Sequence, residues 1–60
     1  MKVFLLFQTD VWKTKSSRVC FGVFDSSEEA YNHAAKNSLY DGETAEIDVI
    51  ETELNKFEEV

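Results

Sequence analysis

Three segments of the chain carry the apolar patterns of β-strands. Residues 3–8 (VFLLFQ) are apolar at both alternating sets of positions, which is typical of the central strand of a sheet. Residues 18–24 (RVCFGVF) are again apolar on both sides. Residues 44–54 alternate with a period of two, and the polarity of the two sides exchanges beyond Val49. The polar stretch 9–17 therefore predicts a long hairpin loop between the first two strands.

One helix is predicted between the second and third strands. Ser26, followed three residues later by Glu29, forms a capping box, and acidic residues suit the positive end of the helix dipole. We expect the helix to run to about Ser38, with small residues on its inner side that let it lie close to the sheet. Residues 40–42 (YDG) should end it, because Gly42 can adopt the left-handed conformation of a helix terminus or turn.

These elements predict an α+β fold of the order ββαβ in a single domain, residues 1–60. A right-handed crossover through the helix places the third strand beside the first and antiparallel to it, so the sheet order is 2-1-3. One helix covers only one face of this three-stranded antiparallel sheet. The second face must be lined by Phe4, Leu6, Cys20 and Phe24, or by the strand residues that alternate with them. This apolar patch is too large for a monomer to leave exposed to solvent. We therefore expect a homodimer packed through that face.

The composition excludes several classes of protein. A chain of 60 residues has a marginal core unless something reinforces it. Cys20 is the only cysteine, which rules out an internal disulfide and fits a reducing, cytoplasmic setting. Cys20 and His33 alone cannot build a zinc site, and we expect neither a metal nor a cofactor. The apolar stretch 1–7 is too short for a signal peptide and predicts a buried strand instead.

The acidic character of the chain bears on its partners. The net charge is −6 at pH 7, so bare nucleic acid and anionic membranes repel the chain, and we expect direct binding to neither. Carboxylates two residues apart on a strand lie ~6.6 Å apart, comparable with successive phosphates of a nucleic-acid strand. The third strand offers two such pairs, Glu46 with Asp48 and Glu51 with Glu53. The third strand is either a solvated edge strand whose charges prevent aggregation, or a surface whose carboxylates take the place of DNA phosphates in the basic groove of an enzyme.

No catalytic constellation is found, and we expect the chain not to be an enzyme. Ser26 and Ser27, the serines nearest to acids, are expected to cap the helix. His33 lies in the middle of the helix without a carboxylate or serine arranged around it. Cys20, among apolar strand residues, is expected to be an inert buried thiol. Trp12, in the hairpin loop, is either folded back over the sheet or an exposed contact residue.

Residues 39–47 (LYDGETAEI) resemble the small acidic phage inhibitors of uracil-DNA glycosylase. In that family a Leu-Tyr near the helix end is followed by a glycine, Thr-Ala, acids and an isoleucine-rich strand. Residues 4–10 (FLLFQTD) are similar to the family's first strand. Those proteins are ββαβ homodimers that mimic DNA and insert an apolar side chain into the enzyme pocket for the flipped base. The resemblance implies the same architecture, a homodimer and a location in the cytoplasm of an infected host cell.

The family's aromatic–acid pair one turn before the Leu-Tyr is replaced here by Lys36 and Asn37. The inserted side chain would then come from Leu39, Tyr40 or Tyr31. We predict an inhibitor that occupies the DNA-binding site of a host enzyme as a DNA mimic, with uracil-DNA glycosylase as the expected partner. The alternative is a small regulatory protein-interaction module with another partner. The predicted partner-binding residues are Leu39, Tyr40, Tyr31, Asp41, Glu43, Glu46, Asp48, Glu51 and Glu53.

Overall fold

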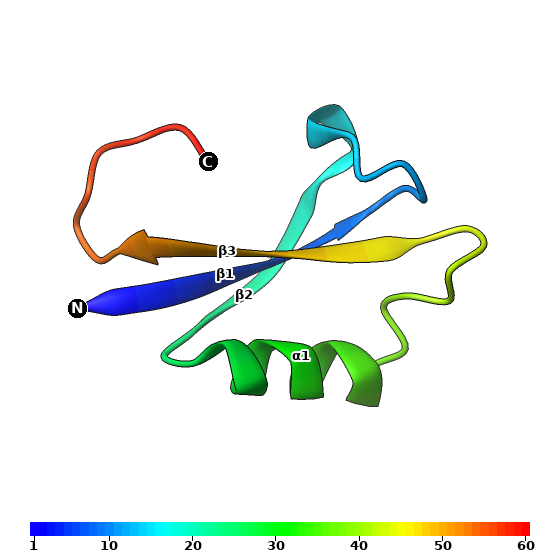
Figure 1. The fold of residues 1–60 in the computed structure, drawn as a ribbon, viewed down its shortest axis with the longest axis horizontal. Helices are drawn as coiled ribbons and strands as arrows, with labels where there is room; N and C mark the ends of the chain where they lie inside the picture. Colours follow the sequence, from blue (N-terminus) through cyan, green and yellow to red (C-terminus); the bar gives the residue numbers. More distant parts are fainter.

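The structure, a computed structural model of residues 1–60, contains one antiparallel sheet and one α-helix. Its elements are β1 (Lys2–Thr9), the 3-10 turn η1 (Lys15–Ser17), β2 (Val19–Phe24), α1 (Ser27–Lys36) and β3 (Glu46–Glu53). The strand order is β2-β1-β3, and both neighbouring pairs are antiparallel. The predicted α+β fold with its 2-1-3 order is therefore confirmed. α1 lies on one side of the sheet, whereas η1 and the C-terminal residues lie on the other (Figure 1).

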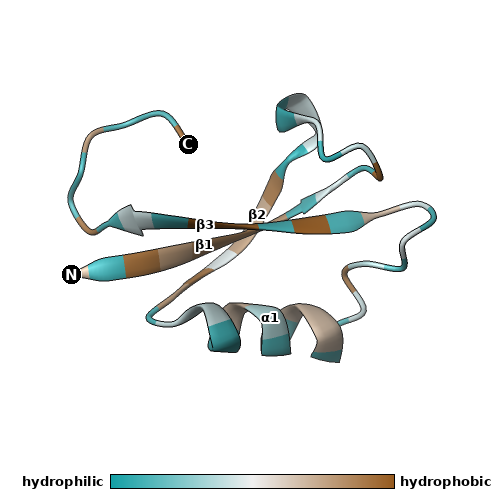
Figure 2. Cartoon of the chain, viewed as in Figure 1, coloured by the Kyte–Doolittle hydropathy of each residue, from teal (hydrophilic) through white to brown (hydrophobic).

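The core lies between α1 and the sheet. Leu6 of β1 is 1% exposed and contacts Ala30 and Ala34 of α1 in a cluster completed by Ile47 of β3. Figure 2 shows that the hydrophobic residues are concentrated in the strands, whereas the helix and loops are mostly hydrophilic or intermediate. Only six of the 60 residues are buried, so each of them contributes a large share of the apolar burial. α1, the one α-helix, is neither long nor apolar enough to cross a membrane.

The side of the sheet that faces away from α1 is partly covered by the chain itself. Leu5 and Phe7 of β1 point to this side and are half-buried. The Arg18 guanidinium lies 5.4 Å from the centre of the Phe7 ring. Arg18 Nη2 also donates to Asp48 Oδ2 and Nη1 to the carbonyl oxygen of Val60, each at 2.8 Å. The homodimer packed through this face stays a prediction, and a second copy would meet these C-terminal residues there.

β2 departs from the expected regular strand. Leu6 and Phe7 of β1 lie opposite Gly22 and Cys20, so the register skips Phe21, which forms a β-bulge. The prediction that Cys20 is buried is wrong, because its thiol is exposed. The physical reason is its position on an edge strand, where only one neighbouring strand covers it, and on the side away from α1.

α1 ends about two residues earlier than predicted. Ser38 adopts a left-handed conformation with φ 54°. Its N–H donates to the carbonyl of Ala35 at 3.2 Å, and the N–H of Leu39 donates to the carbonyl of Ala34 at 3.0 Å. These two bonds form a Schellman motif that closes the helix. Gly42 is also left-handed, with φ 78° as predicted, but it belongs to the turn that follows.

The N-terminus of α1 tests the helix cap that the sequence predicts. Ser26 Oγ accepts a hydrogen bond from the Glu29 N–H at 3.1 Å, which confirms the cap predicted for Ser26, whereas Ser27 is the first residue of α1 and not a cap. We expect Ser26→Ala to lower the free energy of unfolding by about 1 kcal/mol in urea denaturation, because one N–H at the helix start loses its acceptor. Ser27→Ala is the matched control, since Ser27 makes no side-chain cap. Equal losses for the two variants would contradict the assignment.

Candidate protein-binding surface

The carboxylates of β3 divide between the two faces of the sheet, as their spacing predicts. Glu46 and Asp48 lie opposite Thr9 and Phe7 of β1, on the face away from α1. Glu51 and Glu53 lie opposite residues on the helix side of β1. The strand therefore presents two pairs of acids rather than one continuous row.

Most of these acids have a cationic partner within the chain. Three of the four form ion pairs: Asp48 with Arg18 (2.8 Å), Glu51 with Lys2 (3.6 Å) and Glu53 with the N-terminal amine (3.3 Å). The pairs of Glu51 and Glu53 are solvent-exposed, so they are weak and screened by salt. Asp48 is held more firmly, because both partners in its pair are largely buried. Glu46 is the one β3 carboxylate without a cationic partner.

Carboxylates without cationic partners gather in the loop between α1 and β3. No Lys or Arg occurs from residue 37 to residue 55. Glu43 is exposed and forms no ion pair, and Glu46 begins β3 directly after this loop. Asp41 lies between Tyr40 and the glycine of the turn. We call Tyr40, Asp41, Glu43 and Glu46 together the acidic loop.

Asp41 organises the acidic loop through its own carboxylate. Oδ1 accepts hydrogen bonds from the N–H groups of Glu43 and Thr44, both at 2.8 Å, and of Ala45 at 3.2 Å. Oδ2 accepts a further bond from the Thr44 hydroxyl at 2.7 Å. These donors, the Thr44 N–H above all, hold the pKa of Asp41 well below its usual range. Asp41 therefore stays ionised at neutral pH and fixes the shape of the loop.

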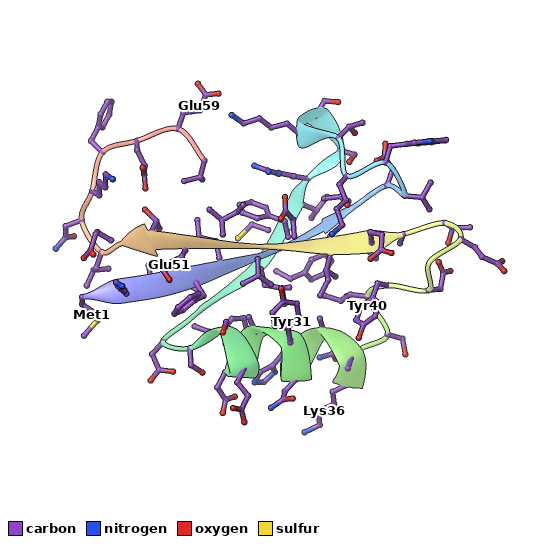
Figure 3. All side chains as sticks on the ribbon, viewed as in Figure 1. Met1, Tyr31, Lys36, Tyr40, Glu51 and Glu59 are labelled. Atoms are coloured by element: carbon purple, nitrogen blue, oxygen red, sulfur yellow. The ribbon has the colours of Figure 1, made fainter.

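Of the three residues predicted to supply the inserted side chain, two are exposed. Leu39 packs against the core, and its carbonyl accepts a hydrogen bond from Gln8 Nε2 at 2.7 Å. Tyr40 is 42% exposed, and Tyr31 is half exposed. Figure 3 shows Tyr31 rising from α1 toward β3, and Tyr40 farther along in the loop that leads to β3. Leu39 is therefore anchored in the core, and Tyr40, the next residue, lies at the surface.

Trp12 lies in the loop after β1 and is 79% exposed, so it is not folded back over the sheet. Asp10 holds this loop much as Asp41 holds the other. Asp10 Oδ1 accepts from the N–H groups of Trp12 and Thr14, each at 3.1 Å, and Oδ2 accepts from the Thr14 hydroxyl at 2.9 Å. These bonds, led by the Thr14 N–H, lower the pKa of Asp10. Trp12 is therefore a second exposed aromatic residue on an ordered loop.

A pocket of about 460 Å³ lies between α1 and the edge strand β2, and sequence patterns gave no signal for it. Its residues are Leu6, Phe21, Phe24, His33, Asn37 and Leu39. The His33 ring stacks on Phe24 with centroids 4.9 Å apart. His33 Nε2 lies 3.6 Å from Glu29 Oε2, an ion pair only when the imidazole is protonated. No serine or cysteine bonds to this histidine, and no three potential metal ligands cluster anywhere in the chain.

The acidic loop predicts a dependence of stability on pH. The pKa of Asp41 is depressed in the folded state, so its stabilising effect is present above the unfolded value of 3.8 and is lost as the pH falls toward the folded value. We expect Asp41→Asn to lower the urea midpoint at pH 7 and to make its decline below pH 3.8 shallower. The Glu43 side chain accepts no hydrogen bonds within the loop, so in Glu43→Gln the urea midpoint should fall with pH as it does in wild type. A decline of the same steepness in wild type and Asp41→Asn would contradict this role.

The chain matches no model of a known protein family. No match was found among curated proteins or among solved structures either. The acidic loop, the exposed aromatic residues and the fold that positions them are therefore the observations from which a function can be inferred.

Proposed function

We propose that this chain is an inhibitor that binds another protein as a DNA mimic and occupies its DNA-binding site. The observation that carries the proposal is the acidic loop. There, three carboxylates without cationic partners follow the exposed ring of Tyr40, in a stretch that contains no Lys or Arg. A surface of this kind complements the basic groove in which an enzyme holds DNA phosphates.

Charge supports the proposal through the rate of association. With a net charge of −6, the chain is attracted over a distance by a basic groove, which raises the association rate at low salt. The ion pairs of Glu51 and Glu53 are exposed and exchangeable, so a cation of the partner can replace Lys2 or the N-terminal amine at little cost. Asp48 is less available, because Arg18 holds it.

Tyr40 is the anchor that we propose for the pocket of the partner enzyme. Tyrosine is common among the residues that dominate binding energy, and its exposed ring needs no rearrangement of the core to reach a partner. Leu39 would have to leave the core before it could insert. The segment 39–47, which resembles the inhibitors of uracil-DNA glycosylase, contains the whole acidic loop. This makes uracil-DNA glycosylase the first partner to test.

A second candidate function is that of a regulatory interaction module whose partner is unrelated to DNA. Trp12 is 79% exposed, more than Tyr40, and Lys13 follows it directly in the chain. A partner that uses Trp12 would recognise an apolar ring with an adjacent positive charge. Variants of Tyr40 and Trp12 therefore distinguish the two functions.

The test of the inhibitor is uracil excision from a labelled oligonucleotide by uracil-DNA glycosylase, titrated with this protein. Stoichiometric wild-type protein should block excision. Tyr40→Ala should raise the dissociation rate about 30-fold, the effect of losing a hot-spot side chain worth about 2 kcal/mol. Trp12→Ala, which removes an even more exposed ring outside the acidic loop, should inhibit like wild type.

The double variant Glu43→Gln/Glu46→Gln separates charge from anchoring. It should slow association and flatten the salt dependence of the association rate, while the dissociation rate changes little. Asp41 is left intact in this variant because it holds the loop together. If stoichiometric wild-type protein leaves excision unaffected, the inhibitor proposal is wrong, and the interaction module takes its place.

A further inference from the structure

The two edges of the sheet differ in how they are protected from pairing with other strands. β3 carries four acids, and charge is a common means of keeping an edge strand from pairing. β2 (VCFGVF) carries no charge at all, and Val19, Phe21 and Val23 are each more than half exposed. Because only β1 pairs with it, its outer backbone groups are free to bond another strand.

The charges that flank β2 indicate which strand fits there. The residues before β2 are basic and those after it are acidic: Lys13, Lys15 and Arg18 precede the strand, and Asp25, Glu28 and Glu29 follow it. A second β2 strand laid antiparallel beside the first brings the basic end of each copy to the acidic end of the other. A parallel arrangement would instead bring like charges together. β2 is therefore complementary to itself about a two-fold axis.

The bulge fixes the register of this pairing. Val23 and Cys20 lie opposite Leu5 and Phe7, which are two residues apart on β1. They therefore point to the same face of the sheet and direct their backbone groups to the same side, although they are three residues apart on β2. A two-fold axis between Phe21 and Gly22 sets Cys20 of each copy opposite Val23 of the other, with matched faces. A regular strand could not pair in this way, because residues an odd number apart face opposite sides.

The same register brings the flanking charges together. Val19 then lies opposite Phe24 of the second copy, and Arg18 lies opposite Asp25. Val19 and Phe24 share the helix side of the sheet, because their β1 partners, Gln8 and Phe4, are four residues apart. One arrangement thus pairs the apolar residues and brings chain ends of opposite charge together, while Lys15 and Arg18 keep their ion pairs with Glu59 and Asp48 of their own chain.

We propose that two copies of this chain pair antiparallel through β2 and form a continuous six-stranded sheet. Both α1 helices lie on the same face of that sheet, and the two pockets between α1 and β2 lie next to the interface. Phe21, which lines the pocket, lies next to the two-fold axis. The C-terminal residues that cover the sheet face away from α1 stay in place in this dimer. A dimer packed through that face would have to displace them.

Disulfide formation tests the register directly. Cys20 is the only thiol of wild type, so wild-type protein is mixed with the variant Cys20→Ser/Val23→Cys and oxidised. The two thiols then lie directly opposite each other, with Cα atoms about 4.5–5.5 Å apart, within the range of a disulfide. The cross-linked heterodimer should form in the mixture and far less in either protein alone. The control is Cys20→Ser/Thr52→Cys, which carries its thiol on the same face as Cys20 and Val23 but on β3, at the opposite edge of the sheet, and should not cross-link to wild type.

Sedimentation tests the interface without cysteine chemistry. Wild type should be a dimer at micromolar concentration, and Val23→Lys should raise the dissociation constant at least ~30-fold, because a charge enters the apolar pairing. Leu54→Lys, at a residue of similar exposure outside β2, adds the same charge and should stay dimeric. Circular dichroism checks that each variant is folded. A wild-type monomer, or preferential cross-linking of Thr52→Cys, would overturn the proposal, whatever the outcome of the excision assay.

Discussion

The close contact between α1 and β1 is the interaction on which the rest of the structure depends. Ala30 and Ala34 let the helix lie against the sheet, and Leu6 fills the space between them. A larger side chain at either alanine would force the helix away, and a smaller one at Leu6 would leave a cavity in a core that has little else. The same core holds Leu39, and through it the start of the acidic loop. The position of Tyr40 at the surface is thus a consequence of this packing.

The features that the sequence predicted correctly are those set by neighbours along the chain or by strand alternation. The helix cap joins Ser26 to Glu29, only three residues away, so its residue types suffice to predict it. The strand order follows from a hairpin and a right-handed crossover, which restrict the possible topologies. The exchange of polarity beyond Val49 correctly placed the β3 acids on two faces. The exposed residues of the acidic loop lie within a segment that its resemblance to the inhibitors had already singled out.

The features that the sequence did not predict depend on contacts between distant residues or on unusual backbone conformations. Asp48 pairs with Arg18, 30 residues away, and no local pattern indicates such a partner. The bulge at Phe21 was missed because β2 is apolar on both sides, so a shift in register leaves no trace in its pattern. The exposure of Cys20 follows from the same edge position. The helix end was misplaced because Ser38, rather than a glycine, adopts the left-handed conformation there.

The proposed function requires the acidic loop to be the surface that binds a partner enzyme. The most direct measurement is nuclear magnetic resonance of the isotope-labelled protein titrated with unlabelled uracil-DNA glycosylase, followed through its backbone amide signals. We expect the largest changes to cluster at Tyr40, Glu43 and Glu46, and an excess of uracil-containing DNA to reverse them. Unchanged spectra at stoichiometric enzyme, or changes confined to the loop around Trp12, would contradict the proposed function.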